Sequence, residues 1–143
     1  MNVKHILSRK GHDVLTIEPT ATLAAAVKML AERRVGALVV TGAGDRIAGI
    51  ISERDIVRVL GEKGTAVLDA PVAETMTRKV VTCGESDTIV EIMEQMTAGK
   101  FRHVPVAEQG RAVGIVSIGD VVKARLEELQ QEHDALRDYI RTA

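Results

Sequence analysis

The feature that most constrains the fold of this chain is an internal repeat. When the sequence is shifted by 66 positions, five residues of the first half meet identical ones, namely Val14, Thr16, Thr22, Val40 and Gly44 with Val80, Thr82, Thr88, Val106 and Gly110. One residue fewer in a loop changes the offset to 65, at which Gly49, Ile50, Ser52, Asp55 and Val57 meet Gly114, Ile115, Ser117, Asp120 and Val122. Two copies are too few for a solenoid, so the repeat predicts a closed pair with pseudo-twofold symmetry.

Each copy has the same expected order of elements: strand, helix, strand, strand and helix. In the first copy we expect them over residues 14–17, 22–33, 35–40, 47–51 and 52–60, and in the second over 80–83, 88–97, 101–106, 112–116 and from 117 onward. Thr22 is a favourable N-cap, and apolar residues follow it on one helical face. Short apolar strands that alternate with helices predict an α/β (α+β) fold whose sheet is covered on one face.

The repeat also predicts the domain organisation. We expect a first domain over residues 1–66 with the N-terminal segment, a second over 67–126 with the linker, and a C-terminal helical extension over 127–143. Along the last helix, spacings of four and three residues separate Val122, Leu126, Leu129, His133, Leu136 and Ile140. This heptad seam with one polar member predicts a homodimer, and packing of the helix on its own domain is the alternative.

Composition narrows the classes of partner. Hydrophobic residues make up 45% of the 143 residues, but Phe101 and Tyr139 are the only aromatic ones, so the core must be aliphatic. The formal net charge of −1 and the scarcity of rings argue against a nucleic-acid partner. No apolar stretch reaches the roughly 18 residues of a membrane span, and Met1–Gly11 lacks the apolar run of a signal peptide. We therefore expect a cytoplasmic protein without a membrane partner.

Neither metal binding nor catalysis is expected. The four histidines lie far apart in the sequence and show no metal-ligand spacing. Cys83 is the single cysteine, which excludes an internal disulfide and fits a reducing compartment. It has no obvious partner to act as a base, and no Gly-x-Ser-x-Gly motif occurs, so we expect no enzyme activity and no catalytic cofactor.

Two Ser-x-x-Asp motifs occupy equivalent positions in the copies. Residues 52–55 and 117–120 each follow a predicted strand and open a helix. The pattern is typical of a capping box, a purely structural device. The same geometry suits a ligand, because a helix N-terminus attracts phosphate and an ionised Asp accepts hydrogen bonds from a ribose diol. Recurrence of the motif does not decide between the two roles.

The strand predicted at residues 101–106 begins with two cationic or near-cationic side chains. Arg102 is a fixed charge that suits phosphate, and His103 adds charge only when protonated. Such a pair is ordinarily solvated surface. The first copy has Gly36 and Ala37 at these positions, which indicates that the two copies are not functionally equal.

Taken together, these motifs resemble those of bacterial tandem CBS (cystathionine-β-synthase) domain proteins. The resemblance covers about residues 3–140 and rests on Gly-Ile-Ile-Ser-Glu-Arg-Asp-Ile-Val at 49–57, Glu-Thr-Met-Thr at 74–77, Phe-Arg-His-Val-Pro-Val at 101–106 and Gly-Ile-Val-Ser-Ile-Gly-Asp-Val-Val at 114–122. Each motif alone is weak evidence for the family, but the order of the motifs within a repeat is specific to it. The resemblance implies a stand-alone regulatory pair without a fused catalytic domain.

The resemblance further implies two pseudo-symmetric clefts for adenine nucleotides, each closed by the segment that precedes the other copy's first strand. Cleft A would be formed by Gly36, Ala37, Ser52, Arg54, Asp55, Thr77, Lys79 and Val81. Cleft B would be formed by Gly11, Asp13, Leu15, Arg102, His103, Pro105, Ser117, Gly119 and Asp120. The aspartates of the two motifs would hold ribose, the serines and basic residues phosphate, and backbone and apolar groups adenine.

The resulting hypothesis is a non-catalytic module for energy sensing that binds AMP, ADP or ATP and acts on a downstream target protein that the sequence does not identify. NAD(H) or S-adenosylmethionine, which share the adenosine moiety, are alternatives for the same clefts. A purely structural homodimerisation module with unoccupied clefts is a further alternative. We expect cleft B to bind phosphate more tightly, because Arg102 begins a strand and should be better ordered than Arg54 in the first turn of a helix.

Overall fold

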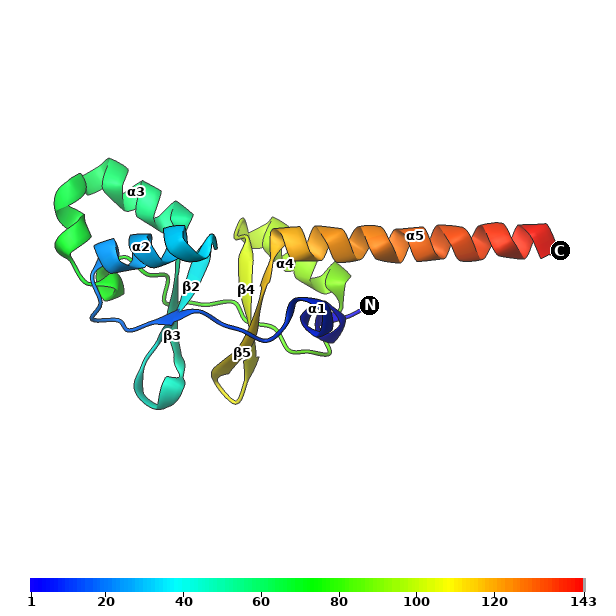
Figure 1. Ribbon diagram of the computed structural model, residues 1–143, viewed down its shortest axis with the longest axis horizontal. Helices are drawn as coiled ribbons and strands as arrows, with labels where there is room; N and C mark the ends of the chain where they lie inside the picture. The colour runs from blue at the N-terminus through cyan, green and yellow to red at the C-terminus, as the bar shows by residue number, and fades with distance from the viewer. Residues whose placement is uncertain (143) are drawn as a thin grey trace.

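The structure is a computed structural model that describes residues 1–142, and its two halves lie side by side (Figure 1). The first half comprises β1 (Thr16–Ile17), α2 (Leu23–Arg33), β2 (Ala37–Thr41), β3 (Ile47–Ser52) and α3 (Glu53–Lys63). The second comprises α4 (Ile89–Gly99), β4 (His103–Glu108), β5 (Arg111–Ser117) and α5 (Ile118–Thr142), and α1 (Val3–Lys10) precedes both halves. This order confirms the predicted mixed α/β fold of two similar copies.

The strand pairing shows that the repeat in the sequence is a repeat in space. β1 pairs parallel to β2, and β2 pairs antiparallel to β3 with Ala37 opposite Ser52. In the second copy β4 pairs antiparallel to β5, with His103 opposite Ser117. Both hairpins shift register at the same place, after Val40 and after Val106, which are 66 residues apart. The one-residue difference between the copies falls in the hairpin loops, because Thr41 pairs with Ile47 whereas Ala107 pairs with Ala112.

Equivalent residues also start and end the equivalent helices. The side chains of Thr22 and Thr88 cap α2 and α4 by accepting hydrogen bonds from the N–H groups of Ala25 and Glu91, each at 3.1 Å. Both helices end in a left-handed residue, Arg34 with φ of 55° and Lys100 with φ of 57°. Because these signals are local, the sequence predicted the start of each helix close to where it is observed.

The second copy lacks one predicted strand among the described residues. Over residues 80–83 only Cys83 forms a bridge, parallel to Val106. The N–H of Cys83 donates to the carbonyl of Pro105 at 3.0 Å, and the N–H of Ala107 donates to the carbonyl of Cys83 at 2.8 Å. The segment therefore follows β4 without forming a ladder, and the sheet of the second copy has two strands where that of the first has three.

Each copy has its own aliphatic core. Leu23, Leu38 and Ile51 are fully buried in the first, and Ile89, Ile92 and Val104 in the second. The helix α1, which was not predicted, adds Val3, Ile6 and Leu7 to the core of the second copy although it comes first in the sequence. A Cβ atom at Gly114 would lie 2.8 Å from Leu7 Cδ2, so this glycine is what allows α1 to pack so closely on β5.

The remaining segments are the connection between the two copies and the C-terminal helix. Residues 61–74, which were predicted to link the copies, contain two short 3₁₀ helices, Thr65–Asp69 and Val72–Glu74, and α3 extends into them as far as Lys63. The C-terminal part of α5 extends away from the rest of the molecule as a single helix (Figure 1). None of the helices described within residues 1–142 is both long and apolar enough to cross a bilayer.

Candidate functional site

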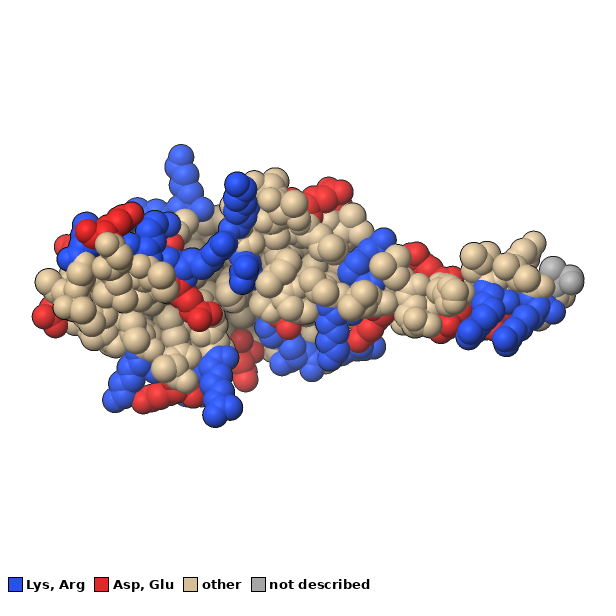
Figure 2. Space-filling view, turned by 90° about the horizontal axis from the view of Figure 1, so that it is seen from above, with Lys and Arg blue, Asp and Glu red and all other residues tan. Residues whose placement is uncertain are grey.

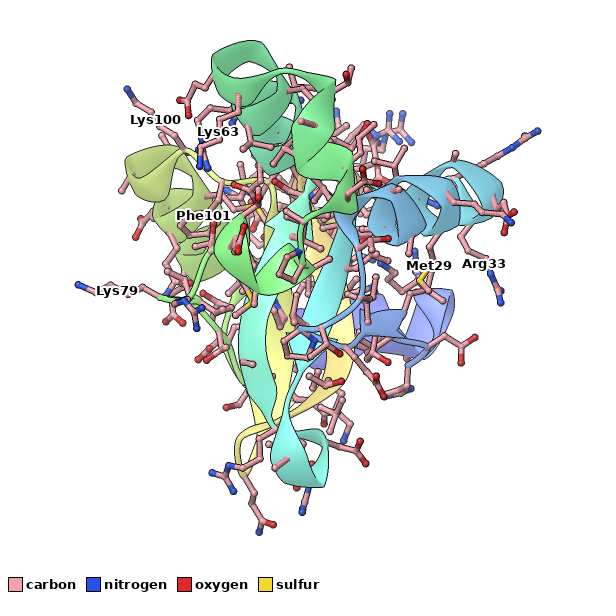
Figure 3. All side chains as sticks on the ribbon, turned by 90° about the vertical axis from the view of Figure 1, so that its left-hand side faces the viewer. Met29, Arg33, Lys63, Lys79, Lys100 and Phe101 are labelled. Atoms are coloured by element: carbon pink, nitrogen blue, oxygen red, sulfur yellow. The ribbon has the colours of Figure 1, made fainter. Side chains whose placement is uncertain are left out.

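A cleft of about 690 Å³ opens where the two copies meet. It surrounds Ser52 and Asp55 and is therefore the cleft A of the sequence prediction. Four segments line it: Gly36 before β2, the end of β3 with the first half of α3, Thr77 with residues 79–81, and residues 99–103 at the end of α4 and the start of β4. Lys79, Lys100 and Phe101 lie on the same side of the molecule in Figure 3. The volume falls within the range of about 300–1,000 Å³ that is typical of small-molecule sites.

Most residues predicted for cleft A do line it. The structure brings together Gly36, Ser52, Arg54, Asp55, Thr77, Lys79 and Val81. Ala37 is instead buried in β2, where it belongs to the core. The capping box and the candidate site therefore coincide at the N-terminus of α3.

Asp55 is held by contacts of two kinds. Its Oδ2 accepts hydrogen bonds from the N–H and the hydroxyl of Ser52, both at 3.0 Å, and the Asp55 N–H donates to Ser52 Oγ at 3.3 Å. Its Oδ1 receives weaker contacts, from Arg58 Nη2 at 3.2 Å and Thr77 Oγ1 at 3.4 Å. Because 3.4 Å is long for a hydrogen bond between oxygens, Oδ1 is the atom that retains capacity for another donor.

Cationic side chains surround the opening of cleft A. The lining includes Arg54, Arg58, Lys79, Lys100 and Arg102, against the carboxylates of Glu53 and Asp55. Arg54 Nη1 donates to the carbonyl oxygen of Lys100 at 2.8 Å, and this bond joins α3 of the first copy to the end of α4 in the second. Figure 2 shows Lys and Arg side chains gathered near the junction of the two halves. The cleft therefore presents a positive surface to an anionic ligand.

One wall of cleft A is apolar and fixed by backbone pairing. Ile50, Val80 and Val81 contribute aliphatic side chains to it. Thr77 pairs with Ile50 through two backbone hydrogen bonds, of 2.9 and 3.0 Å, which hold the linker against β3. The lining of cleft A therefore includes apolar side chains beside its charged ones.

The starts of β2 and β4 meet at cleft A. A Cβ atom at Gly36 would lie 2.7 Å from Glu53 Oε1 and 2.9 Å from His103 Cε1. This proximity places Arg102 and His103, which were predicted for cleft B, in the lining of cleft A. Burial lowers the pKa of His103, and the carboxylate of Glu53 only partly opposes this effect. His103 is therefore neutral near pH 7, and Arg102 supplies the fixed charge.

The surroundings of Asp120, at the centre of the predicted cleft B, are closed by Lys10. Lys10 Nζ lies 2.7 Å from Asp120 Oδ2 and 3.0 Å from the carbonyl oxygen of Ile115. The space left beside Asp120 is about 120 Å³ and is lined by α1 and α5. Burial by itself would raise the pKa of Asp120, but the hydrogen bond from Lys10, together with those from Ser117 and the charge of Lys10, lowers it below its usual value.

The difference between the clefts follows from where α1 ends. In the first copy, the backbone of Thr77 pairs with Ile50. At the equivalent position of the second copy, the N–H of Gly11 instead donates to the carbonyl of Leu7 at 2.8 Å and ends α1. The side chain of Lys10 therefore reaches Ile115 where the linker backbone reaches Ile50.

The other residues predicted for cleft B are dispersed. Pro105 is buried in β4 and pairs with Ile115, whereas Asp13 is exposed. Leu15 packs against the core of the first copy, and its carbonyl accepts from the N–H of Val39 at 3.1 Å. Gly119 lies on a groove along α5. Ser117 and Asp120 form the reciprocal hydrogen bonds of a helix cap, at 2.9 and 3.2 Å.

Sequence reasoning missed several residues of the site. Lys100, Arg58 and Phe101 line cleft A, and Lys10 closes the space beside Asp120. The repeat contains a signal for Lys10, because an offset of 66 aligns it with Met76, which is buried in the first copy. A cation in place of a buried methionine indicates a local charge partner, and Asp120 is that partner.

The described residues offer binding groups more than reactive ones. Burial, with a further contribution from Asp87, raises the pKa of the Cys83 thiol to about 12, so the thiol stays protonated. Within residues 1–142, no three or more His, Cys, Asp and Glu side chains are arranged to hold a metal ion. The groups that line cleft A are cations, a carboxylate whose Oδ1 has only long contacts, and aliphatic side chains.

Comparison with known proteins shows similarity over most of the chain. A model of the CBS domain matches residues 3–62 and 72–127. The crystal structure of the CBS-domain containing protein ATU1752 from Agrobacterium tumefaciens is 47% identical with a TM-score of 0.85, and the match covers 87% of this chain and 99% of that one. A mitochondrial CBS domain-containing protein of Arabidopsis thaliana, CBSX3, is 38% identical over 119 residues, which are 80% of this chain and 58% of the relative's length.

Two similar structures contain adenosine compounds. The CBS domain protein PAE2072 from Pyrobaculum aerophilum was solved in complex with AMP; it is 29% identical, with a TM-score of 0.78 and coverage of 92% of this chain and 99% of that one. The CBS domain pair of protein MJ0100 was solved with 5′-methylthioadenosine and S-adenosyl-L-methionine. It is 26% identical, with a TM-score of 0.79 and coverage of 90% and 98%.

Proposed function

The chain belongs to the CBS-domain family as a tandem pair, a regulatory module, and from this premise we propose that its cleft A binds an adenine nucleotide without transforming it. The ligand would contact both copies and fix their relative position. A target protein would then respond to the bound state of the pair.

The observation that carries this proposal is the meeting of three kinds of group in one cleft. A ribose diol would replace the long contact of Thr77 with Asp55 Oδ1, while Oδ2 stays in the helix cap. The phosphate would lie near the N-terminus of α3, where the helix dipole and the guanidinium of Arg54 favour an anion. Adenine would lie against the wall of Ile50 and Val81.

The ligands of the two relatives support the adenosine part of the proposal. AMP, 5′-methylthioadenosine and S-adenosyl-L-methionine share that moiety. The cations that line cleft A favour a ligand with phosphate over the sulfonium of S-adenosyl-L-methionine. NAD(H), which also carries phosphates, is the alternative for the same cleft.

We propose cleft A, and not cleft B, as the nucleotide site. This reverses the expectation from the sequence that cleft B binds phosphate more tightly. That ranking assigned Arg102 to cleft B, but Arg102 lines cleft A. The space beside Asp120 is about 120 Å³ and its carboxylate is already paired with Lys10. We therefore expect one nucleotide per chain.

Calorimetric titration of ligand-free protein with AMP and ATP tests the proposal, using Asp55→Asn and the matched Asp120→Asn. Asparagine keeps an oxygen that can cap the helix but loses the charge. A charge-assisted hydrogen bond contributes about 1.5–3 kcal/mol, so Asp55→Asn should weaken binding roughly tenfold or more. Asp120→Asn should bind like the parent. Equal binding by the parent and Asp55→Asn, or loss of binding in Asp120→Asn alone, would contradict the assignment to cleft A.

A further inference from the structure

Four cations of cleft A have no acidic partner. Arg54, Lys79, Lys100 and Arg102 line the cleft, and none of them lies within 4.0 Å of a carboxylate oxygen among residues 1–142. Arg58, the fifth cation of the lining, does pair with Asp55, at 3.2 Å. Most of the positive charge of this cleft is therefore available to a ligand.

This charge is local and not a property of the whole chain. The lining contains five cations and two carboxylates, an excess of three positive charges, whereas the chain carries a formal net charge of −1. One of the two carboxylates, Asp55, is already engaged by Ser52 and Arg58. A polyanion would bring several negative charges to this local excess of positive charge.

The four cations come from separate segments of the lining of cleft A. Arg54 is in the first turn of α3, beside Ser52, and its guanidinium reaches the carbonyl of Lys100 on the opposite copy. Lys100 and Arg102 flank Phe101, and Lys79 extends from the same side of the molecule (Figure 3). A single phosphate beside Ser52 would leave part of this series without a counter-charge.

Resting on the proposed function, we propose that cleft A distinguishes adenine nucleotides by the number of their phosphates and prefers the triphosphate to the monophosphate. Each added phosphate brings about one further negative charge and further acceptor oxygens to the lysines and arginines. The side chains are exposed, so screening by salt makes the gain moderate and dependent on ionic strength.

The test is a competition titration of ligand-free protein with AMP, ADP and ATP in magnesium-free buffer at two ionic strengths. The dissociation constant should fall at least about fivefold from AMP to ATP at low salt, and the difference should shrink as salt rises. Lys100→Ala and Arg102→Ala should weaken the binding of ATP more than that of AMP, so that most of the preference for ATP is lost. Lys28→Ala on α2, which removes an exposed lysine whose partner is Glu32, is the matched control and should behave like the parent.

The outcomes separate this inference from the proposed function. AMP that binds as tightly as ATP would overturn the phosphate preference and leave adenine-nucleotide binding in place. An unchanged preference in both Lys100→Ala and Arg102→Ala would overturn its assignment to these charges. GTP or inorganic triphosphate binding as tightly as ATP would instead contradict recognition of adenine and support recognition of polyphosphate. If none of these compounds bound, both proposals would fail.

Discussion

The two aspartates of the repeat show how neighbours change the use of one motif. Asp55 and Asp120 both accept from the N–H of the serine three residues earlier, at 3.0 and 2.9 Å. Asp55 turns its second oxygen towards Thr77 and cleft A, whereas Asp120 is paired with Lys10. The same helix cap is therefore compatible with an open site in one copy and a closed one in the other.

At this scale, replacing Lys10 should reduce stability in a pH-dependent way. The pKa of Asp120 is lowered in the folded protein. The ion pair of Lys10 with Asp120 therefore stabilises the fold fully at pH values above the ordinary carboxyl pKa of about 4. This stabilisation is lost as the pH falls through the lower pKa that Asp120 has in the folded protein. Because both side chains are partly exposed, Lys10→Met should reduce the free energy of unfolding by only about 0.5–1 kcal/mol at pH 7.

Urea denaturation of the parent and Lys10→Met at neutral and acidic pH measures this effect. The two proteins should become equally stable once Asp120 is protonated. Lys4→Met, an exposed position on the same helix, is the control and should match the parent at both pH values. A difference for Lys10→Met that persisted unchanged in acid would show that the ion pair is not its cause.

At the scale of elements, the sequence predicted those structures whose signals are local. Thr22 and Thr88 mark the starts of α2 and α4, and the serine of each Ser-x-x-Asp motif marks the end of a strand. α1 was not predicted, because a charged helix of eight residues owes its place to three apolar residues that face the distant second core. Residues 80–83 have the composition of a strand, but they form only one bridge with β4.

The grouping of the candidate site came from the resemblance to tandem CBS proteins. That resemblance placed Ser52, Asp55 and Thr77 in one cleft, and all three line cleft A. It placed Arg102 and His103 in the other cleft; His103 does pair with Ser117, but both residues also line cleft A. An alignment of the copies along the sequence does not show that Gly36 and His103 approach each other in space, and this approach gives cleft A charges from both copies.

For the whole molecule, the exposed seam of α5 predicts association of two chains. Leu126, Leu136 and Ile140 have 62%, 59% and 65% of their surfaces exposed, and all lie on the heptad seam. A second copy would bury these side chains, and burial stabilises by about 25 cal/mol for each Å² of apolar surface. We therefore expect a homodimer to which α5 contributes.

Light scattering of the parent and of a double variant, Leu129→Asp with Leu136→Asp, tests the role of α5. Two carboxylates within the seam should shift the mass from dimer towards monomer. Gln131→Asp, which adds a charge outside the seam, should leave the mass unchanged. A dimer that survives in the double variant would show that α5 is not the association surface, and a monomeric parent would contradict the homodimer.

The central claim is that an adenine nucleotide binds in cleft A and not beside Asp120, and a proton–nitrogen NMR titration with ATP tests it most directly. Because the repeat provides equivalent amides in both copies, one experiment contains its own control. The account predicts large shifts for the amides of Ser52, Asp55 and Thr77, and saturation at one ATP per chain. Shifts centred on Ser117, Gly119 and Asp120, with the amides of cleft A unchanged, would contradict it.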